Sequence, residues 1–213
     1  MGKLSSFNNL NVFWKFISGN GVWMAESPTQ MFWSDGLIDA INNTGKQLFV
    51  SDLAVVIKDK YPKALHHFLV LPWKDIDSVY ELSSDDDGLL QEMYELGSKA
   101  ASTSGLPAGQ FEYGYHMKPS MRRLHLHVIS KDYHSPCLSH WYHWNAFNTD
   151  FFIKHEYVVK KLHEKGCIDR PHTQHVMTLL ETPLQCNQCT YVPKNFKDLK
   201  LHLKQHVEYG QHS

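Results

Sequence analysis

The chain has 213 residues, which is enough for one compact domain with a small appendage and too few for two full-sized catalytic domains. Hydrophobic residues make up 42% of it and charged residues 20%, so we expect a globular fold with a buried core. No stretch approaches the roughly 18 consecutive apolar residues of a membrane span, so we expect a soluble protein without membrane partners.

The formal net charge is −1, which excludes the strong overall positive charge of many nucleic-acid-binding proteins. The distribution is uneven: 12 basic residues stand against 16 acidic ones up to residue 150, and 9 against 6 beyond it. Two of the four cysteines have Cys-x-x-Cys spacing with histidines downstream. This pattern indicates a reducing compartment and a metal site rather than disulfides.

Two strands are expected early in the chain. Residues 1–30 show no apolar segment with a small-residue cleavage site, so we predict no secretory signal and assign this N-terminal extension no function. The apolar, β-branched run Leu48–Ile57 predicts a strand, and HHFLVLP, ending at Pro72, predicts a second strand antiparallel to it.

A helix and two further strands follow. Acidic residues at 85–87 precede apolar residues spaced by three and four up to Ala100, which is typical of an amphipathic helix. Residues 111–116 and 124–130 predict two strands joined by MKPSMRR. Strands and helices in this order favour an α+β fold, with an antiparallel sheet flanked by helices. A helical segment near residues 155–165 then leads through a polar linker to a small module that starts near Leu184.

Alternating side chains mark the last of these strands. Successive strand residues point to opposite faces, so His125, His127 and Arg123 are expected on one face and the leucines between them on the other. By itself this pattern fits a wet edge strand or a metal site equally well. Its context favours a polar site, because four other polar residues flank neighbouring strands. They are Lys63, His67, His116 and Ser120.

These residues carry a resemblance to a known family. RLHLHVI, with DKYPKALHHFLVLP and GYHMKPSM upstream, resembles the histidine-triad superfamily of nucleotide hydrolases and transferases. Within it the order of YPKA, LVLP, GYH, PSM, HLHVIS, SPCL and HWNAFNT is most similar to the aprataxin family, over roughly residues 32–206. The resemblance implies a histidine-triad catalytic domain at residues 31–154, a helix and linker at 155–183, and a zinc finger at 184–213.

The resemblance also implies an activity. Aprataxins remove AMP that is joined through a 5′,5′-pyrophosphate to a DNA end. His125 matches the nucleophile that attacks the adenylate phosphorus and becomes covalently bound to AMP, His116 matches the proton donor to the departing phosphate, and His127 matches the histidine that hydrogen-bonds the phosphate oxygens. Matched nucleotide- and phosphate-binding residues are Asp59 at the ribose, Lys63, His67, Ser120 and Arg123. No catalytic metal is expected.

Arg123 stands where the family has its first histidine. A guanidinium accepts no hydrogen bond, so it cannot fix the tautomer of a neighbouring imidazole as a neutral histidine does. Its charge is instead expected to depress the pKa of His125 and keep this nucleophile neutral. We expect activity to survive the replacement.

Other departures concern contacts with a polynucleotide. Leu65 stands at a position that is usually basic, and residues 139–142 (SHWY) replace a stretch that is usually lysine-rich. Each lost phosphate contact removes about 0.7–0.9 from the slope of log affinity against log salt, so we expect weak DNA binding. Trp141 and Tyr142 either stack on bases or are ordinary surface or core aromatics. Trp33 matches a helix that wedges against the DNA end, with core packing as the alternative.

The C-terminal module carries the spacing Cys-x2-Cys-x12-His-x3-His of a zinc site. Its ligands are Cys186, Cys189, His202 and His206. We expect a small ββα-like finger that holds one structural zinc ion and is unfolded without it. Four lysines fit either phosphate contacts that anchor the catalytic domain on damaged duplex, or a solvated helix face. They are Lys194, Lys197, Lys200 and Lys204.

The sequence is compatible with three functions. The first is a DNA-repair hydrolase that releases AMP from 5′-adenylated ends, which implies a nuclear protein and leaves a mitochondrial pool open. The second is a hydrolase of small nucleotides such as adenosine phosphoramidates or dinucleoside polyphosphates, which Leu65 and the SHWY stretch favour. The third is a zinc-finger protein that binds DNA ends and has a decayed catalytic site, which Arg123 suggests. The sequence does not identify the protein partners.

Overall fold

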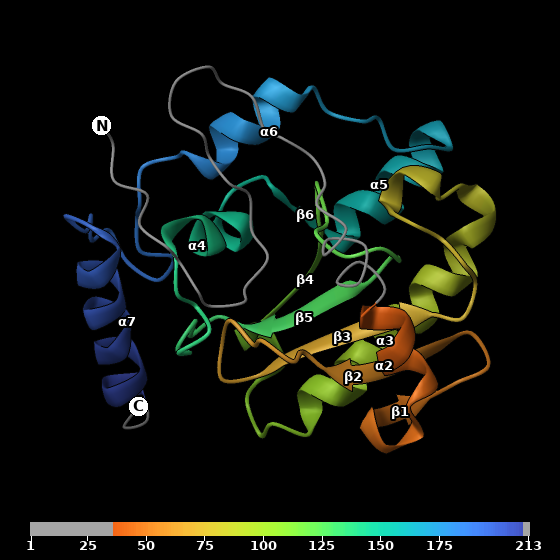
Figure 1. The fold of residues 1–213 in the computed structure, drawn as a ribbon, viewed down its shortest axis with the longest axis horizontal. Coiled ribbons are helices and arrows are strands. Elements are labelled where there is room, and N and C mark those ends of the chain that lie inside the picture. The colour runs from red at the N-terminus through yellow and green to blue at the C-terminus, as the bar shows by residue number, and fades with distance from the viewer. Residues whose placement is uncertain (1–35, 211–213) are drawn as a thin grey trace, which may run out of the picture.

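The computed structural model describes residues 36–210, so Trp33 and its predicted DNA contact lie outside the described residues. Six strands form one antiparallel sheet in the order β1-β2-β3-β5-β4-β6 (Figure 1). Their bounds are β1 Gln47–Val50, β2 Ala54–Lys58, β3 His67–Pro72, β4 Phe111–His116, β5 Leu126–Ser130 and β6 Phe152–Lys154. The predicted α+β class and the antiparallel pairing of the strands around residues 54–58 and 67–72 are confirmed.

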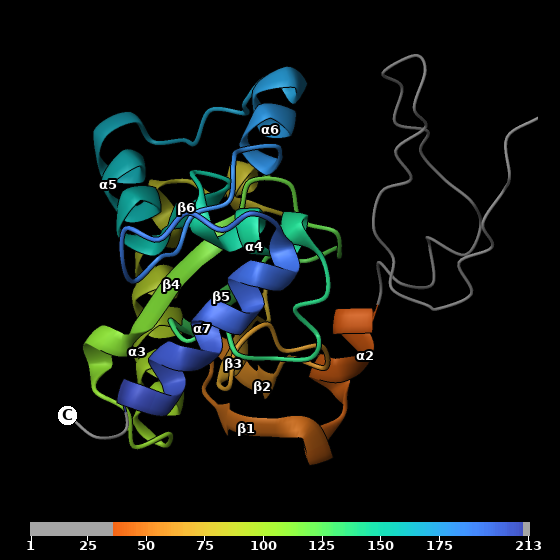
Figure 2. The same ribbon diagram turned by 90° about the vertical axis from the view of Figure 1, so that its left-hand side faces the viewer.

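Helices flank this sheet on both faces. They are α2 Gly36–Asn42, α3 Asp87–Ser102, α4 Trp141–Asn148, α5 His155–Lys165, α6 Thr173–Leu180 and α7 Phe196–Gly210. Helix α3 packs against Val128 of β5, whereas α7 belongs to a cluster that contains the next residue, Ile129. Because neighbouring strand residues point to opposite faces, α3 and α7 lie on opposite sides of the sheet, as Figure 2 shows.

The run that predicts a single strand at residues 48–57 forms two strands, so that expectation is wrong. The backbone N–H of Ser51 donates to the carbonyl of Ala54, and the Ser51 hydroxyl accepts from the N–H groups of Leu53 and Ala54. This turn reverses the chain, and β1 pairs with β2 as a hairpin. A serine side chain that satisfies backbone donors makes a turn without glycine or proline.

A glycine allows the last two strands in the sheet order, β4 and β6, to approach each other closely. A Cβ atom on Gly114 of β4 would lie 2.6 Å from the carbonyl oxygen of Ile153 and 2.8 Å from the Phe152 ring. Phe152 in turn packs beside the rings of His116 and His127. Because Gly114 has no side chain, the Phe152 ring has room to pack against His116 and His127.

The C-terminal module packs directly on the sheet domain. Leu199 and Leu203 of α7 share one buried cluster with Ile129, Trp144 and Phe147. The expected helix of the finger is present. The expected pair of strands is absent, because residues 184–195, all of which the structure describes, form no strand. The N–H of Cys186 instead donates to the carbonyl of Tyr191 across a single turn. No helix within the described part of the chain is long and apolar enough to cross a membrane.

Candidate active site

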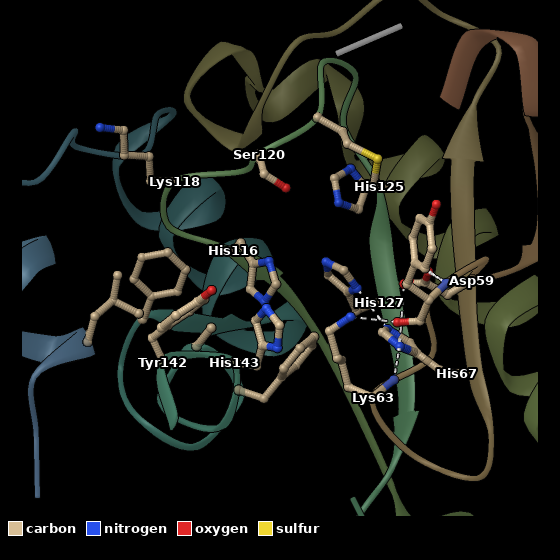
Figure 3. A pocket seen from close by; sticks show the side chains of 16 residues that line it. Asp59, Lys63, His67, His116, Lys118, Ser120, His125, His127, Tyr142 and His143 are labelled. Atoms are coloured by element: carbon tan, nitrogen blue, oxygen red, sulfur yellow. Dashed lines mark hydrogen bonds and ion pairs between the residues drawn. The ribbon is translucent and has the colours of Figure 1, made fainter. Parts of the chain in front are cut away.

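One cavity gathers seven of the eight residues that are predicted for catalysis and nucleotide binding. The space that these residues enclose is about 1000 Å³ when the open space at its mouth is included. The seven are Asp59, Lys63, His67, His116, Ser120, His125 and His127. Figure 3 shows Asp59 and His67 at one end of it, Lys118 and Tyr142 at the other, and the imidazoles between them.

Strand register explains why the histidines meet. His127 of β5 pairs with Leu69 of β3 and with Gly114 of β4. His67 and His116 each lie two residues from those partners on the neighbouring strands, which puts them diagonally across from His127 on the same face. The centroid of the His127 ring lies 4.4 Å from that of His116 and 5.2 Å from that of His67.

Hydrogen bonds set the tautomers of two of these rings. The backbone N–H of Lys63 donates to Nδ1 of His67, at 3.1 Å, so this nitrogen carries a lone pair. The Nε2 of His67 therefore carries the proton in the neutral ring, and it donates to Nδ1 of His127 at 3.0 Å. It follows that the Nε2 of His127 is an N–H donor, and this buried atom has no hydrogen-bond partner among the described residues.

His125 has the opposite tautomer. Its Nδ1 lies 2.8 Å from the carbonyl oxygen of Arg123, which can only accept, so Nδ1 carries the proton. The Nε2 of the neutral ring is then left with a lone pair, and the His125 side chain lines the cavity beside His127, with 4.7 Å between the ring centroids. The site therefore combines one nitrogen lone pair with one N–H donor.

Burial keeps these rings uncharged. It lowers the pKa of His125 and lowers that of His67 to about 4, because a buried imidazolium loses its hydration. The pKa values of His116 and His127 lie well below the ordinary value, chiefly through burial and then through the neighbouring histidines. Neutral imidazoles are nucleophiles and hydrogen-bond donors, which suits a site for an anionic phosphate.

Arg123 does not lie where the strand pattern predicts. Strand β5 begins at Leu126, and Arg123 has a φ angle of 83°, so the alternation of faces stops before it. Its guanidinium lies outside the cavity and donates to the carbonyl oxygens of Pro72, Trp73 and Lys74. Burial, rather than repulsion by this guanidinium, is the main cause of the lowered pKa of His125.

A carboxylate and an ammonium stand at one end of the cavity. Oδ1 of Asp59 accepts the N–H of Tyr61 at 2.7 Å, and the Lys63 ammonium donates to the carbonyl of Tyr61 at 2.6 Å. Burial lowers the pKa of Lys63, and the nearby Asp59 carboxylate partly opposes this. The chain segment before β3 thus brings an acceptor and a cation to the rim of the histidine cluster.

Helix α4 forms a wall of the cavity that the sequence reasoning missed. His143 and Phe147, one helical turn apart, both line the cavity, and the Phe147 ring packs edge-on against the rings of His116 and His127. Tyr61 and Met121 are further lining residues that were not singled out. The only available signal for His143 and Phe147 is their four-residue spacing within the HWNAFNT block.

The residues expected to contact DNA differ in their exposure to solvent. Lys194, Lys197 and Lys204 are exposed on the finger, whereas the ammonium of Lys200 donates to the carbonyls of Ser135 and Leu138. Lys200 therefore joins the finger to the sheet domain. Leu65 is 52% exposed and Trp141 is 42% exposed, while Tyr142 is half-buried and lines the cavity.

The four predicted metal ligands converge on one point. Sγ of Cys189 lies 3.1 Å from Nε2 of His202 and 3.6 Å from Nε2 of His206, and Sγ of Cys186 lies 3.4 Å from Nε2 of His206. All four ligand atoms lie within 4.8 Å of one another. Zinc bonds of about 2.0–2.3 Å in a tetrahedron place ligand atoms at separations of this size, so these residues fit a zinc ion.

A second group within the described chain, Asp59, His67 and His127, also offers three metal-ligand atoms within 4.8 Å. Here the ring nitrogens of His67 are occupied: one accepts from the Lys63 backbone and the other donates to His127. We therefore assign this group to hydrogen bonding.

The antiparallel sheet with its histidine cluster defines a protein of the histidine-triad type. A family model described as "Scavenger mRNA decapping enzyme C-term binding" matches residues 33–143, and a model described as "C2HE / C2H2 / C2HC zinc-binding finger" matches residues 148–209. The chain belongs to the first of these families, and the second match together with the ligand geometry identifies a zinc-binding module.

The expected resemblance to aprataxins is confirmed. The chain is 42% identical to an aprataxin-like protein of Drosophila melanogaster over 84% of its own length and 27% of that protein, and 39% identical to aprataxin of Gallus gallus over 82% and 55%. It thus spans about half the length, or less, of these relatives. A crystal structure of the aprataxin ortholog Hnt3 in complex with DNA superposes with a TM-score of 0.65 at 20% identity, covering 83% of this chain and 95% of that one, which shows the shared fold.

Proposed function

We propose that the protein is a DNA-repair hydrolase that removes AMP from 5′-adenylated DNA ends, the products of abortive ligation. The observation that supports this most is the pair of neutral rings in the cavity: His125 and His127, whose ring centroids lie 4.7 Å apart, have opposite tautomers, with a lone pair on Nε2 of the first and an N–H on Nε2 of the second. One supplies a nucleophile for phosphorus and the other a donor for the phosphate oxygens.

The first step forms a bond between Nε2 of His125 and the adenylate phosphorus. The bond from phosphorus to the pyrophosphate bridging oxygen breaks, and its electron pair leaves with the DNA 5′-phosphate. His127 donates its Nε2 proton as a hydrogen bond to a non-bridging oxygen, where the negative charge increases. Asp59 binds the ribose hydroxyls, and Lys63 and Ser120 stabilise the phosphates at the rim of the cavity.

The second step returns the enzyme to its starting state. Water attacks the phosphorus, the bond from phosphorus to Nε2 of His125 breaks and returns its electron pair to that nitrogen, and AMP leaves with the water oxygen. His116, neutral after giving up its proton in the first step, accepts the proton that the water loses. In the first step of this proposal, His116 is the proton donor to the departing DNA 5′-phosphate. Its ring centroid lies 4.4 Å from that of His127. Burial lowers its pKa well below the ordinary value, so it is neutral in the empty cavity and needs the anionic substrate beside it to be protonated. A phosphate monoester is itself a good leaving group because its second pKa is about 6, so this help is modest.

The finger anchors the catalytic domain on DNA in this proposal. The structural homologue Hnt3 is described in complex with DNA, and exposed Lys194, Lys197 and Lys204 offer phosphate contacts on this chain. We assign one structural zinc ion to the four ligands, the catalytic domain to residues 31–154, the linker to 155–183 and the finger to 184–213. A protein that works on damaged DNA is expected in the nucleus, and the similarity to aprataxins supports this part of the proposal.

Hydrolysis of small nucleotides is the second candidate. Exposed, apolar Leu65 offers no phosphate contact, and Tyr142 lines the cavity with an aromatic ring where a basic residue is typical of aprataxins. Both features lower the expected affinity for a polynucleotide without changing the residues proposed to bind the adenylate. A DNA-end-binding protein with a decayed catalytic site is the third candidate, and the intact hydrogen bond from His125 to the Arg123 carbonyl argues against it.

A comparison of two substrates separates the three candidates. The protein is incubated with a 5′-adenylated nicked duplex and, in parallel, with adenosine phosphoramidate, and AMP release is followed. We expect a higher kcat/KM on the nicked duplex. A higher kcat/KM on the phosphoramidate would favour the small-nucleotide hydrolase, and binding of the duplex without AMP release from either compound would favour the decayed protein.

A further inference from the structure

We propose that Arg123 is a positioning residue that sets the tautomer of His125: its guanidinium is clamped to the chain segment after β3, and this clamp holds its own carbonyl against Nδ1 of the histidine. The inference deepens the proposed function, because it gives a role to the residue that replaces the first histidine of the triad. It rests on that function only for its kinetic consequence.

The backbone of Arg123 is in an unfavourable conformation. Its φ of 83° lies in the left-handed region, where side chains other than glycine, asparagine and aspartate are uncommon. Among the described residues other than glycine only Tyr133, with a φ of 46°, also has a positive φ. This conformation aims the Arg123 carbonyl at Nδ1 of His125, at 2.8 Å. Surrounding contacts must therefore hold it in place.

The guanidinium supplies those contacts. Nη2 lies 2.9 Å from the carbonyl oxygen of Pro72, 3.0 Å from that of Trp73 and 3.1 Å from that of Lys74, so its two hydrogens are shared among three acceptors. Nη1 lies 3.5 Å from Oδ1 of Asp75, and only 11% of the Arg123 side chain is exposed. Three successive carbonyls thus converge on one cation.

The same segment is bound again one residue further along. The N–H of Leu124 donates to the carbonyl of Ile76 at 2.7 Å. The segment that leaves β3 therefore holds both the side chain of Arg123 and the backbone that follows it. Between these two attachments the Arg123 carbonyl has little freedom to turn away from His125.

The clamp explains how the site works without the first histidine. Any residue at position 123 has a carbonyl, but its direction depends on the backbone. A neutral histidine has one N–H donor and a shorter side chain, so it cannot bridge the carbonyls of Pro72, Trp73 and Lys74 in this chain. The guanidinium acts on His125 through the backbone and does not contact the substrate.

The test compares two variants with a matched control. Arg123→Gly removes the clamp but tolerates the positive φ, and Arg123→Lys keeps the charge but loses the fork of donors. Arg122→Met is the control, because it removes a neighbouring guanidinium that bonds Asp77 at 2.7 Å and shares with Arg123 the Asp75 carboxylate, at 3.9 Å from Arg122. For each full-length, zinc-loaded protein, two-bond ¹H–¹⁵N correlation spectra of the unliganded protein report which nitrogen of His125 carries the proton. Kinetics on adenosine phosphoramidate and on adenylated duplex give kcat and KM.

We expect His125 to be protonated on Nδ1 in the native protein and in Arg122→Met, and to show a mixture of tautomers in Arg123→Gly. In that variant kcat should fall roughly 10- to 100-fold with little change in KM, and Arg123→Lys should lie between. An Nδ1–H spectrum and a kcat within twofold of the native protein in Arg123→Gly would overturn the proposal. If this variant does not fold, Arg123→Lys decides by the same two readouts. If the native protein hydrolyses neither compound, the proposed function fails, and the tautomer spectra still decide whether the clamp acts.

Discussion

The Nε2 atom of His67 lies 3.0 Å from the Nδ1 atom of His127. Through this contact, the backbone N–H that binds Nδ1 of His67 also determines which nitrogen of His127 carries the proton. Because Lys63 donates to His67 and His67 donates to His127, the proton on His127 lies on Nε2, the nitrogen that is proposed to bind the phosphate. The N–H donor that His127 offers is thus set by a main-chain group of residue 63.

Removing this relay should slow the reaction. We expect His67→Phe to lower kcat roughly 10- to 100-fold with little change in KM, because His127 then loses the bond that fixes its donor. His67→Gln, whose amide can still donate to His127, should retain more activity. Steady-state kinetics on adenosine phosphoramidate check this, with His66→Gln as the neighbouring control. Equal kcat values for His67→Phe and the native protein would contradict the relay.

Acid should destabilise the protein because of the same histidine. The pKa of His67 is about 4 in the folded protein and near 6.5 in the unfolded chain, so the unfolded chain binds an extra proton between these values. The contribution of His67 is present above pH 6.5 and is lost as the pH falls, by about 2 kcal/mol between pH 7 and pH 5. Urea unfolding at both pH values measures this, and the fall should be smaller by about that amount in His67→Phe. An equal fall in the two proteins would contradict the assignment.

The finger should hold one zinc ion and depend on it. Cys189→Ser removes a ligand from the cluster, so we expect zinc content to fall from one equivalent per chain towards zero and helix α7 to unfold, since structural zinc contributes much of the folding energy of such modules. Metal analysis and circular dichroism check both effects. Cys167→Ser, which changes an exposed free cysteine, should leave both unchanged. Full helicity of Cys189→Ser after chelation would show that α7 needs only its apolar packing.

Two lysines of the finger should behave differently. Exposed Lys197 is proposed to contact phosphate, so Lys197→Met should weaken DNA binding and reduce the slope of log affinity against log salt by about 0.7–0.9. Lys200 bonds the carbonyls of Ser135 and Leu138, so Lys200→Met should lower the melting temperature and leave that slope unchanged. Titrations of adenylated duplex at several salt concentrations separate the two. The opposite pattern would place Lys200 at the DNA.

Much of the site was predictable because it follows the period of a strand. The alternation at His125 and His127, and the place of His116 at the end of the preceding strand, are local properties of the sequence. The sheet register then brings them together. The same holds for the zinc ligands, whose spacing along the chain is set by one turn and one helix.

Other features depend on the tertiary structure. An arginine gives no sign of a positive φ, so Arg123 was expected on the histidine face. His143 reaches the cavity because α4 packs against the linker, where the Asn145 amide donates to the carbonyls of Leu180 and Thr182. The hairpin at Ser51 was missed because a serine turn lacks the usual glycine or proline. In each case a side chain forms hydrogen bonds with backbone groups, and these bonds determine the local structure in place of the alternation of polar and apolar residues.

In the proposed mechanism, Nε2 of His125 forms a covalent bond to phosphorus. The most direct measurement is intact-mass spectrometry of the protein quenched without acid during a single turnover of adenylated duplex, followed by mapping of the modified residue. We expect one AMP bound to His125 in the native protein and none in His125→Ala. Release of AMP without any adenylylated protein, or an adduct that persists in His125→Ala, would contradict it.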